Sequence, residues 1–259
     1  KPSFWRAPVD NDLGSRRDFA VAQWKLASLY RRCIKKELMD EEGNWQEFDW
    51  FGQLGQKEFD ASFVKLRFTY ELATQPASIC SMTYTVTRDG SVKVELDYDK
   101  VEGLPEIPDF AMIFTLPADY DQVRFYGFGP LDNYADRQRG AKLGIYETTT
   151  KDEVEPYLMP QETGNHCGVR WIEAVDKRGR GLRLSMDETP FEASALPYSA
   201  HELENARHPY DLPEIHHTYL RASLGQCGVG GDNTWGAPVL PEYTVKNETK
   251  HFSFYIKAI

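Results

Sequence analysis

Segments of strand length in which apolar and polar residues alternate recur along most of this chain. Residues 63–72 and 92–98 alternate in this way, residues 81–87 are rich in Thr, Tyr and Val, and residues 88–91 carry a turn signal. A period of two places apolar side chains on one face of a sheet and polar side chains on the other, which is typical of antiparallel strands. We expect further strands at residues 110–116, 122–128, 169–175, 181–186, 218–225 and 252–258.

The sequence predicts only one short helix near the N-terminus, over residues 18–30, with Asp18 as its cap. Its apolar residues at approximately helical spacing are Phe19, Ala22, Leu26 and Leu29. Many strands and almost no helix are typical of a β-sandwich. The predicted fold class is therefore all-β.

The length and composition favour one large domain. The chain has 259 residues, of which 41% are hydrophobic, so it can bury a sizeable core. It shows no internal repeat and no linker-like segment, and we expect residues 1–259 to form a single wide sandwich. Residues 129–168 and 194–217 are polar and lack alternation, and we expect them to be long loops that serve function or an interface.

Charge and cysteine content exclude several classes of partner. A formal net charge of −10 argues against nucleic acid and against an anionic membrane surface, whereas a neutral partner such as a sugar is compatible with it. The four cysteines stand far apart without a Cys-x-x-Cys pair, which weakens any zinc interpretation. No apolar run approaches the length of a transmembrane helix. We expect no metal and no cofactor in this domain.

Three motif resemblances are rejected on spacing. Residues 10–14 resemble a calcium loop, but the glycine comes one position early and Val21 stands where the loop requires Glu. Residues 201–205 lack the second histidine of a zinc-protease helix, and His216 and His217 point to opposite faces if they lie on a strand.

A glycine-rich loop near the end of the chain carries an aromatic residue. Residues 228–236 read Gly-Val-Gly-Gly-Asp-Asn-Thr-Trp-Gly. Glycine permits backbone angles closed to other residues, so such a loop can hold the indole of Trp235 outside the core as a surface for the apolar face of a sugar. The alternative is a hairpin tip whose Trp packs on the sheet, and the motif alone leaves both open.

Four blocks of this sequence, taken together and in this order, resemble a known family. They are Phe-Trp-Arg-Ala-Pro-Val-Asp-Asn-Asp-Leu-Gly (4–14), Tyr-Gly-Phe-Gly-Pro-Leu-Asp-Asn-Tyr-Ala-Asp-Arg (126–137), Tyr-Leu-Met-Pro-Gln-Glu-Thr-Gly-Asn-His-Cys-Gly-Val-Arg (157–170) and Gly-Gly-Asp-Asn-Thr-Trp (230–235). The chain resembles the C-terminal small-chain region, domain 5, of family 2 β-galactosidases. That resemblance implies a large β-supersandwich of the galactose mutarotase type.

The resemblance also implies a role. Trp235 stands where the family places an aromatic platform for the sugar, with Asp232 and Asn233 shaping its loop as further substrate-binding candidates. A retaining glycosidase needs two neighbouring carboxylates, which in this family lie in a separate (β/α)8 barrel. We therefore expect a domain excised from a longer chain, without catalytic residues or hydrolase activity of its own.

The partners that the resemblance implies are a galactoside substrate, the catalytic barrel domain of the parent chain, and further copies of the full-length enzyme in a homo-oligomer. Any Mg²⁺ or Na⁺ would belong to the other domains of the parent enzyme. The compartment stays open between the cytoplasm and the periplasm of a bacterium.

Two other functions remain open at this stage. An aldose 1-epimerase needs a histidine acid facing a carboxylate base, and the candidates are His166 near Glu162, or His217. A non-catalytic carbohydrate-binding module would use a strip of tryptophans, although most of these residues are expected to fill the core or an interface. The available tryptophans outside the loop are Trp5, Trp24, Trp45, Trp50 and Trp171.

Charged residues in the four blocks are expected to anchor loops or to line the site. The pairs we expect are Arg6 with Asp10 or Asp12, Asp136 with Arg137, and Glu162 with Arg170. Arginine suits such pairs because its planar guanidinium binds a carboxylate through two hydrogen bonds.

Overall fold

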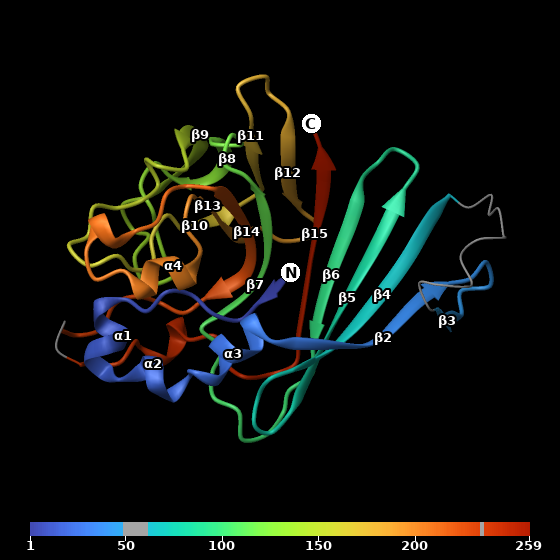
Figure 1. Ribbon diagram of the computed structural model, residues 1–259, viewed down its shortest axis with the longest axis horizontal. Helices are drawn as coiled ribbons and strands as arrows, with labels where there is room; N and C mark the ends of the chain where they lie inside the picture. The colour runs from blue at the N-terminus through green and yellow to red at the C-terminus, as the bar shows by residue number, and fades with distance from the viewer. Residues whose placement is uncertain (49–61, 234–235) are drawn as a thin grey trace.

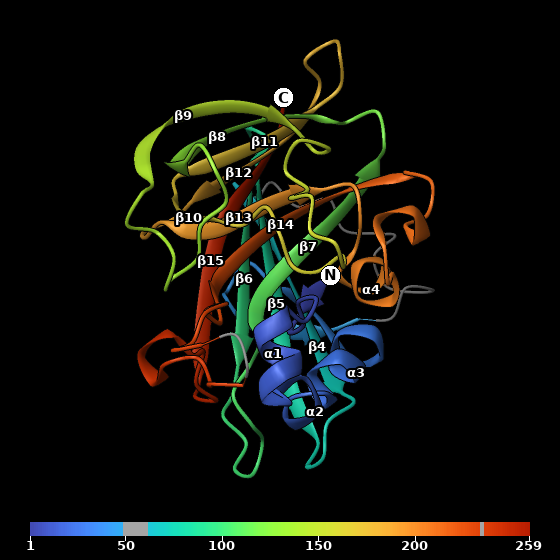
Figure 2. The ribbon, with the colours of Figure 1, turned by 90° about the vertical axis from the view of Figure 1, so that its left-hand side faces the viewer.

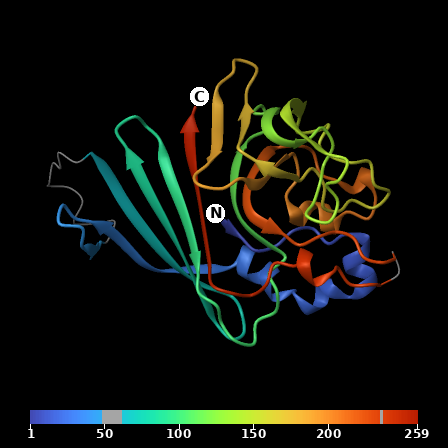
Figure 3. The ribbon, with the colours of Figure 1, turned by 180° about the vertical axis from the view of Figure 1, so that it is seen from behind.

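The computed structural model describes residues 1–48, 62–233 and 236–259, which form two antiparallel β-sheets. Figures 1 and 3 show the larger sheet fanning outward at one end, while the helices and most loops gather at the other end. The five-stranded sheet has the order β1 (Pro2–Ser3), β7 (Asp109–Pro117), β14 (His217–Gln226), β13 (Phe191–Leu196) and β10 (His166–Val169).

The ten-stranded sheet begins with the strands of the outward fan. In order these are β3 (Trp45–Glu47), β2 (Arg31–Met39), β4 (Phe63–Leu72), β5 (Ser78–Thr87) and β6 (Val92–Tyr98). The sheet continues with β15 (Lys250–Ala258), β12 (Gly181–Met186), β11 (Trp171–Val175), β8 (Gln122–Gly129) and β9 (Lys142–Thr149). The predicted all-β fold class with wide sheets is confirmed.

The main core lies between the two sheets. Alternation along β14 turns Leu220 and Ala222 into this core, where Leu96 of β6 and Phe254 of β15 are also fully buried. Because β14 alternates, Tyr219 and Arg221 point to the opposite face of the five-stranded sheet. Figure 2 shows that face next to α4 and the N-terminal segment. Both faces of the smaller sheet are therefore covered.

The predicted strand bounds agree with the structure where apolar and polar residues alternate clearly in the sequence. Strands rich in charged or small residues were not predicted. The bounds of β4, β6 and β12 coincide with the predicted segments. The predicted strand at residues 169–175 is instead divided at Arg170, because Val169 ends β10 in the five-stranded sheet and β11 lies in the ten-stranded sheet. We predicted no strand for β2, β9 or β13, whose charged or small residues conceal the alternation; β9 and part of β13 fall in the expected loops.

Helical structure is found over the predicted residues 18–30, but the expected single helix is wrong in number, because two short helices share that segment. The described residues contain α1 (Asp10–Ser15), α2 (Arg17–Ala20), α3 (Gln23–Leu29) and α4 (Ala200–Asn205), and two 3-10 turns, η1 (Pro209–Asp211) and η2 (Pro241–Tyr243). Asp18 does not cap a helix, because α2 begins one residue earlier, after Arg16 at φ 56°.

The buried face of this segment is not the one that the spacing suggested. Val21 and Trp24 are buried, whereas Phe19 and Leu26, which suggested the helical period, are exposed. Trp24 packs against Phe4 at a ring-centroid distance of 5.6 Å. No helix among residues 1–48, 62–233 and 236–259 is long and apolar enough to cross a membrane.

Trp24 should carry much of the stability of this end of the molecule. We expect Trp24→Ala to lower the free energy of unfolding by about 3–5 kcal/mol, because it removes a fully buried indole and leaves a cavity. Phe19→Ala is the matched control: the ring is 79% exposed, so its loss should change stability by less than about 0.5 kcal/mol. Urea denaturation measures both, and equal effects would contradict this packing.

Candidate functional site

Arg6 lies between β1 and α1 and is buried, with 3% of its surface exposed. Its Nη2 lies 2.8 Å from Asp12 Oδ2 and donates to the Gly228 carbonyl oxygen at 3.2 Å. Burial lowers the pKa of Arg6, but Asp12 together with the nearby Cys227, Glu162 and Tyr134 more than offsets this, so the pKa is above its ordinary value. The charged guanidinium therefore ties the start of the chain to the glycine-rich loop.

Asp136 holds the same loop from another side. Its Oδ1 accepts a hydrogen bond from the Val229 N–H at 3.2 Å, and its Oδ2 accepts one from the Gly230 N–H at 2.7 Å. A Cβ on Gly228 would come within 2.5 Å of Asp136 Oδ2. Glycine at this position therefore allows the carboxylate to reach the backbone of the loop.

Further backbone contacts fix residues 228–231. The Asn11 side chain donates from Nδ2 to the Gly230 carbonyl oxygen at 2.7 Å, and the Gly228 N–H donates to the Tyr243 carbonyl oxygen at 2.8 Å. A Cβ on Gly231 would lie 2.5 Å from the Ala237 carbonyl oxygen, which is backbone and has little room to move. Backbone N–H groups and backbone carbonyl oxygens of the loop are thus both held by hydrogen bonds.

Glu162 joins this arrangement through the N-terminal segment. Its Oε2 accepts from the Ala7 N–H at 3.3 Å, and its Oε1 accepts from Gln226 Nε2 at 3.0 Å. Burial raises the pKa of Glu162, while the nearby Arg221 and Arg6 act in the opposite direction. We call Arg6, Asn11, Asp12, Asp136 and Glu162 the loop clamp.

The loop clamp brings together all four sequence blocks that carry the family resemblance. Residues 4–14 supply Arg6, Asn11 and Asp12, residues 126–137 supply Asp136, and residues 157–170 supply Glu162. The held loop leads directly into the fourth block, whose Asp232 and Asn233 are exposed. Asn233 Oδ1 accepts from the Ala237 N–H at 3.4 Å. Trp235 lies outside the described residues.

The expected ion pairs are only partly correct. Arg6 pairs with Asp12, while Asp10 is exposed and its N–H donates to Gln161 Oε1 at 3.1 Å. The pairing of Asp136 with Arg137 is wrong, because Arg137 turns to Asp132 at 2.5 Å.

The pairing of Glu162 with Arg170 is also wrong. Arg170 donates to the Gly168 carbonyl oxygen and lies 5.5 Å from the centre of the Tyr126 ring. In both cases the arginine contacts a group nearby in its own segment of the chain rather than the predicted carboxylate.

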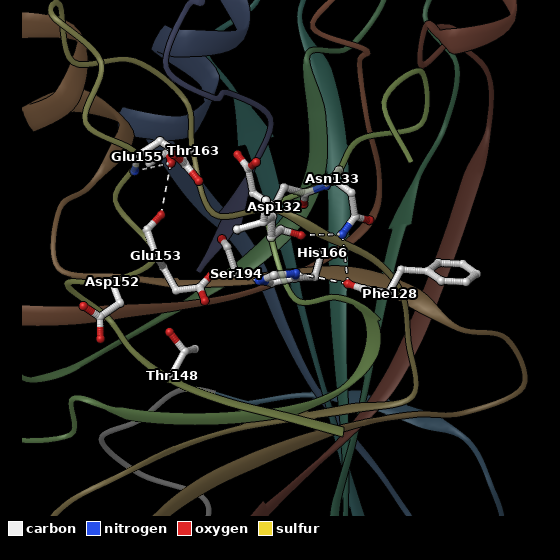
Figure 4. A network of polar contacts seen from close by, with 12 residues as sticks. Phe128, Asp132, Asn133, Thr148, Asp152, Glu153, Glu155, Thr163, His166 and Ser194 are labelled. Atoms are coloured by element: carbon white, nitrogen blue, oxygen red, sulfur yellow. Dashed lines mark hydrogen bonds and ion pairs between the residues drawn. The ribbon is translucent and has the colours of Figure 1, made fainter. Parts of the chain in front are cut away.

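His166 lies away from the loop clamp, in the polar network of Figure 4. It is 1% exposed, its Nε2 is 2.7 Å from Glu153 Oε2, and its Nδ1 is 3.2 Å from the Phe128 carbonyl oxygen. Its ring stacks on Phe125 with the centroids 3.9 Å apart. The expected neighbour Glu162 is not its partner; the carboxylate at His166 is that of Glu153, and the pair is buried.

Sequence reasoning missed a buried polar layer on the outer face of the five-stranded sheet. Arg221 lies 2.8 Å from Asp109 Oδ1, donates to Ser194 Oγ at 3.1 Å, and also contacts Asn165 Oδ1. Ser223 Oγ donates to Asp109 Oδ1 at 2.6 Å. Burial raises the pKa of Asp109, and Arg221 opposes this shift. The available signal was Asp109 at the start of the largely apolar β7 and Arg221 in the middle of β14.

The loop clamp positions the glycine-rich loop. The carboxylates of Asp12, Asp136 and Glu162 each accept hydrogen bonds from backbone N–H groups. Such charge-assisted bonds are shorter and stronger than neutral ones. No group of three or more His, Cys, Asp or Glu side chains in the described part of the chain is arranged to ligate a metal. The clamp therefore presents a rigid loop rather than a metal centre.

Residues 1–256 match the family described as beta galactosidase small chain. A beta-galactosidase of Halalkalibacterium halodurans is 38% identical over 262 residues, which cover 100% of this chain and 24% of that protein. A beta-galactosidase small subunit of Latilactobacillus sakei is 31% identical over 278 residues, covering 99% of this chain and 84% of the subunit.

The chain thus spans about a quarter of the length of the first of these relatives. Among solved structures, one described as a candidate aldose 1-epimerase of Escherichia coli K12 aligns over 86% of this chain and 78% of its own, with 9% identity and a TM-score of 0.39.

The Arg6–Asp12 pair should contribute far more to the free energy of unfolding than a surface ion pair does. We expect Arg6→Met to lower the free energy of unfolding by about 3–5 kcal/mol, because Asp12 would remain buried without its closest counter-charge. Arg32→Met is the matched control, since Arg32 is 73% exposed and its pair with Glu71 is worth at most about 1 kcal/mol. Thermal or urea unfolding measures both, and a small effect of Arg6→Met would refute the role of the pair.

Proposed function

The chain belongs to the beta galactosidase small chain family, and on this premise we propose that it forms one wall of a site that hydrolyses terminal β-galactosides. In this proposal Trp235 is the aromatic platform for the sugar ring. Asp232 and Asn233, which are both exposed, shape its loop and form hydrogen bonds with the hydroxyl groups of the sugar. An indole face suits the apolar C–H face of a pyranose, while neighbouring polar groups fix its orientation.

The observation that carries the proposal is the loop clamp. Three of its side chains, Arg6, Asn11 and Asp136, come from two distant segments and hold residues 228–230 through backbone donors and acceptors. The other two act indirectly, since Asp12 pairs with Arg6 and Glu162 holds Ala7 and Gln226. An ordinary hairpin tip does not need buried charges at its base, because solvent satisfies its backbone groups. A binding loop does need them, since a contact group must be held within a fraction of an ångström of its working position.

The bond-breaking carboxylates belong elsewhere in this proposal. A retaining glycosidase of family 2 uses a general acid/base and a nucleophile close together, and we place both in a larger partner, a (β/α)8 barrel. The name of the Latilactobacillus sakei relative, a small subunit, supports a division of labour between a small and a large part. Residues 1–259 alone should then show no hydrolase activity.

The epimerase alternative is not favoured. Its histidine candidate His166 is buried with both ring nitrogens engaged, and the carboxylate at its Nε2 is Glu153. His217 is exposed and packs on Tyr219. Neither histidine faces Glu162, which is occupied by Ala7 and Gln226.

Removing the aromatic platform should impair hydrolysis without unfolding the protein. In the enzyme that contains this chain, we expect Trp235→Ala to lower kcat/KM for a β-galactoside by about 5- to 150-fold, equivalent to roughly 1–3 kcal/mol of lost contact. The matched control is Trp45→Ala, which removes a partly exposed indole that stacks on Arg67 of the outer strands. Unchanged kinetics for Trp235→Ala would reject the role.

Asp136 should act as a positioning residue for the same loop. We expect Asp136→Ala to lower kcat/KM by a similar factor, because two backbone N–H groups lose a charged acceptor worth about 1.5–3 kcal/mol each. Asp136→Asn keeps one acceptor oxygen and should recover part of the activity. In a double-mutant cycle, Trp235→Ala and Asp136→Ala should be strongly non-additive. Additive effects would mean that Asp136 does not act through the loop.

A further inference from the structure

A second concave site lies on the outer face of the five-stranded sheet, separate from the exposed part of the glycine-rich loop. It is a cavity of about 270 Å³ enclosed by the N-terminal segment, α3, α4 and the sheet itself. Pockets for drug-sized ligands usually measure about 300–1,000 Å³, so this cavity suits one small ring rather than a chain of them.

The walls of the cavity are aromatic. Trp5 is 7% exposed, and its Nε1 donates to Glu204 Oε2 at 3.0 Å, which fixes the plane of the indole. Tyr198 and Tyr219, from the β13–α4 connection and β14, are half-buried and also line the cavity. Such rings offer flat apolar faces together with hydroxyl groups that can form hydrogen bonds.

The floor of the cavity is polar, and its charges compensate each other. Asp109 and Arg221 face the cavity and pair with each other at 2.8 Å, and Arg6 is neutralised by Asp12 at 2.8 Å. Ser194 adds a hydroxyl group beside Arg221. Glu162 also lines the cavity and interacts with both Arg6 and Arg221, so carboxylates and guanidinium groups are mixed on the floor and neither sign of charge dominates there.

Two buried polar atoms at the floor still need partners. Asp109 Oδ2 and Arg6 Nε have no hydrogen-bond partner among the described residues. Asp109 is fully buried and Arg6 nearly so, and an unsatisfied buried acceptor or donor costs about 1–3 kcal/mol. One is an acceptor and the other a donor, and a hydroxyl group can serve either of them.

We propose that this cavity binds a neutral monosaccharide, a hexopyranose, with its apolar face on Trp5 and its hydroxyl groups toward the floor at Asp109 and Ser194. The combination of aromatic walls, a compensated polar floor, unsatisfied atoms of both kinds and a one-ring volume favours this ligand over an anion or an apolar molecule. The proposed site does not use the side chain of Trp235, but it shares Arg6 and Glu162 with the loop clamp.

The test counts sugar sites in the protein that contains this chain. Titration calorimetry and saturation-transfer NMR with D-galactose and D-glucose, in the Trp235→Ala background, report hexose binding when the proposed galactoside site is weakened, and the cavity variants below separate the two sites. Lactose tests whether a second ring is admitted, and D-galacturonate and glycine test whether charged ligands compete. We expect the hexoses to bind, lactose to bind more weakly, and the two charged probes to be excluded.

Variants assign the binding to the cavity. Tyr219→Ala removes one aromatic wall and should weaken hexose binding at least tenfold. Tyr210→Ala is the matched control, because that ring is 80% exposed and lies outside the cavity, and it should change the affinity by less than twofold. Asp109→Asn keeps the shape of the floor but replaces the buried carboxylate, and it should also weaken binding. Circular dichroism checks that each variant is folded.

Three results would overturn the proposal: no hexose binding in the Trp235→Ala background, binding that is equal in Tyr219→Ala and Tyr210→Ala, or preferential binding of galacturonate or glycine. These outcomes are separate from those of the hydrolysis assay. Loss of activity on Trp235→Ala with no cavity binding would leave the galactosidase proposal intact. Hexose binding in the cavity, together with unchanged hydrolysis by the Trp235→Ala variant, would support the cavity site and reject the proposed role of Trp235.

Discussion

The buried guanidinium of Arg6 is the contact on which the functional end of this molecule depends. A charge that is removed from water must be paired and fully hydrogen-bonded, or it destabilises the fold by several kcal/mol. Arg6 meets most of this requirement with the Asp12 carboxylate and the Gly228 carbonyl oxygen, while its Nε has no hydrogen-bond partner among the described residues. The N-terminal segment, α1 and the glycine-rich loop must therefore assemble together, and a change in one displaces the others.

A similar constraint governs the five-stranded sheet, because it is covered on both faces. One face meets the ten-stranded sheet through residues such as Leu220, and the other lies under α4 and the N-terminal segment. Charged residues on the second face cannot reach solvent, so Arg221 and Asp109 pair with each other across neighbouring strands. A polar layer within a covered sheet fixes register, and it leaves a few polar atoms available for a ligand.

The sequence predicted the parts of the fold that local pattern determines. Alternation located β4, β6 and β12, and in β6 it coincides with burial, since Val94, Leu96 and Tyr98 are buried. It failed for β13, whose small residues conceal the period. For residues 18–30 the spacing suggested a face with Phe19 and Leu26, whereas Val21 and Trp24 are the buried residues. The four sequence blocks identified the candidate site, but not its pairs. Asp136 binds backbone N–H groups of a segment more than ninety residues away, which no local rule can foresee.

The loop clamp and the cavity share two groups, and this connects them physically. Arg6 Nη2 contacts the loop, while Arg6 itself also lines the cavity. Glu162 likewise lines the cavity and holds Ala7 of the N-terminal segment. A guanidinium is planar and rigid, so a ligand that bonds to Nε restrains the orientation of Nη2 as well. Any coupling between the two places must be reciprocal, since a ligand that tightens the loop is itself bound more tightly when the loop is ordered.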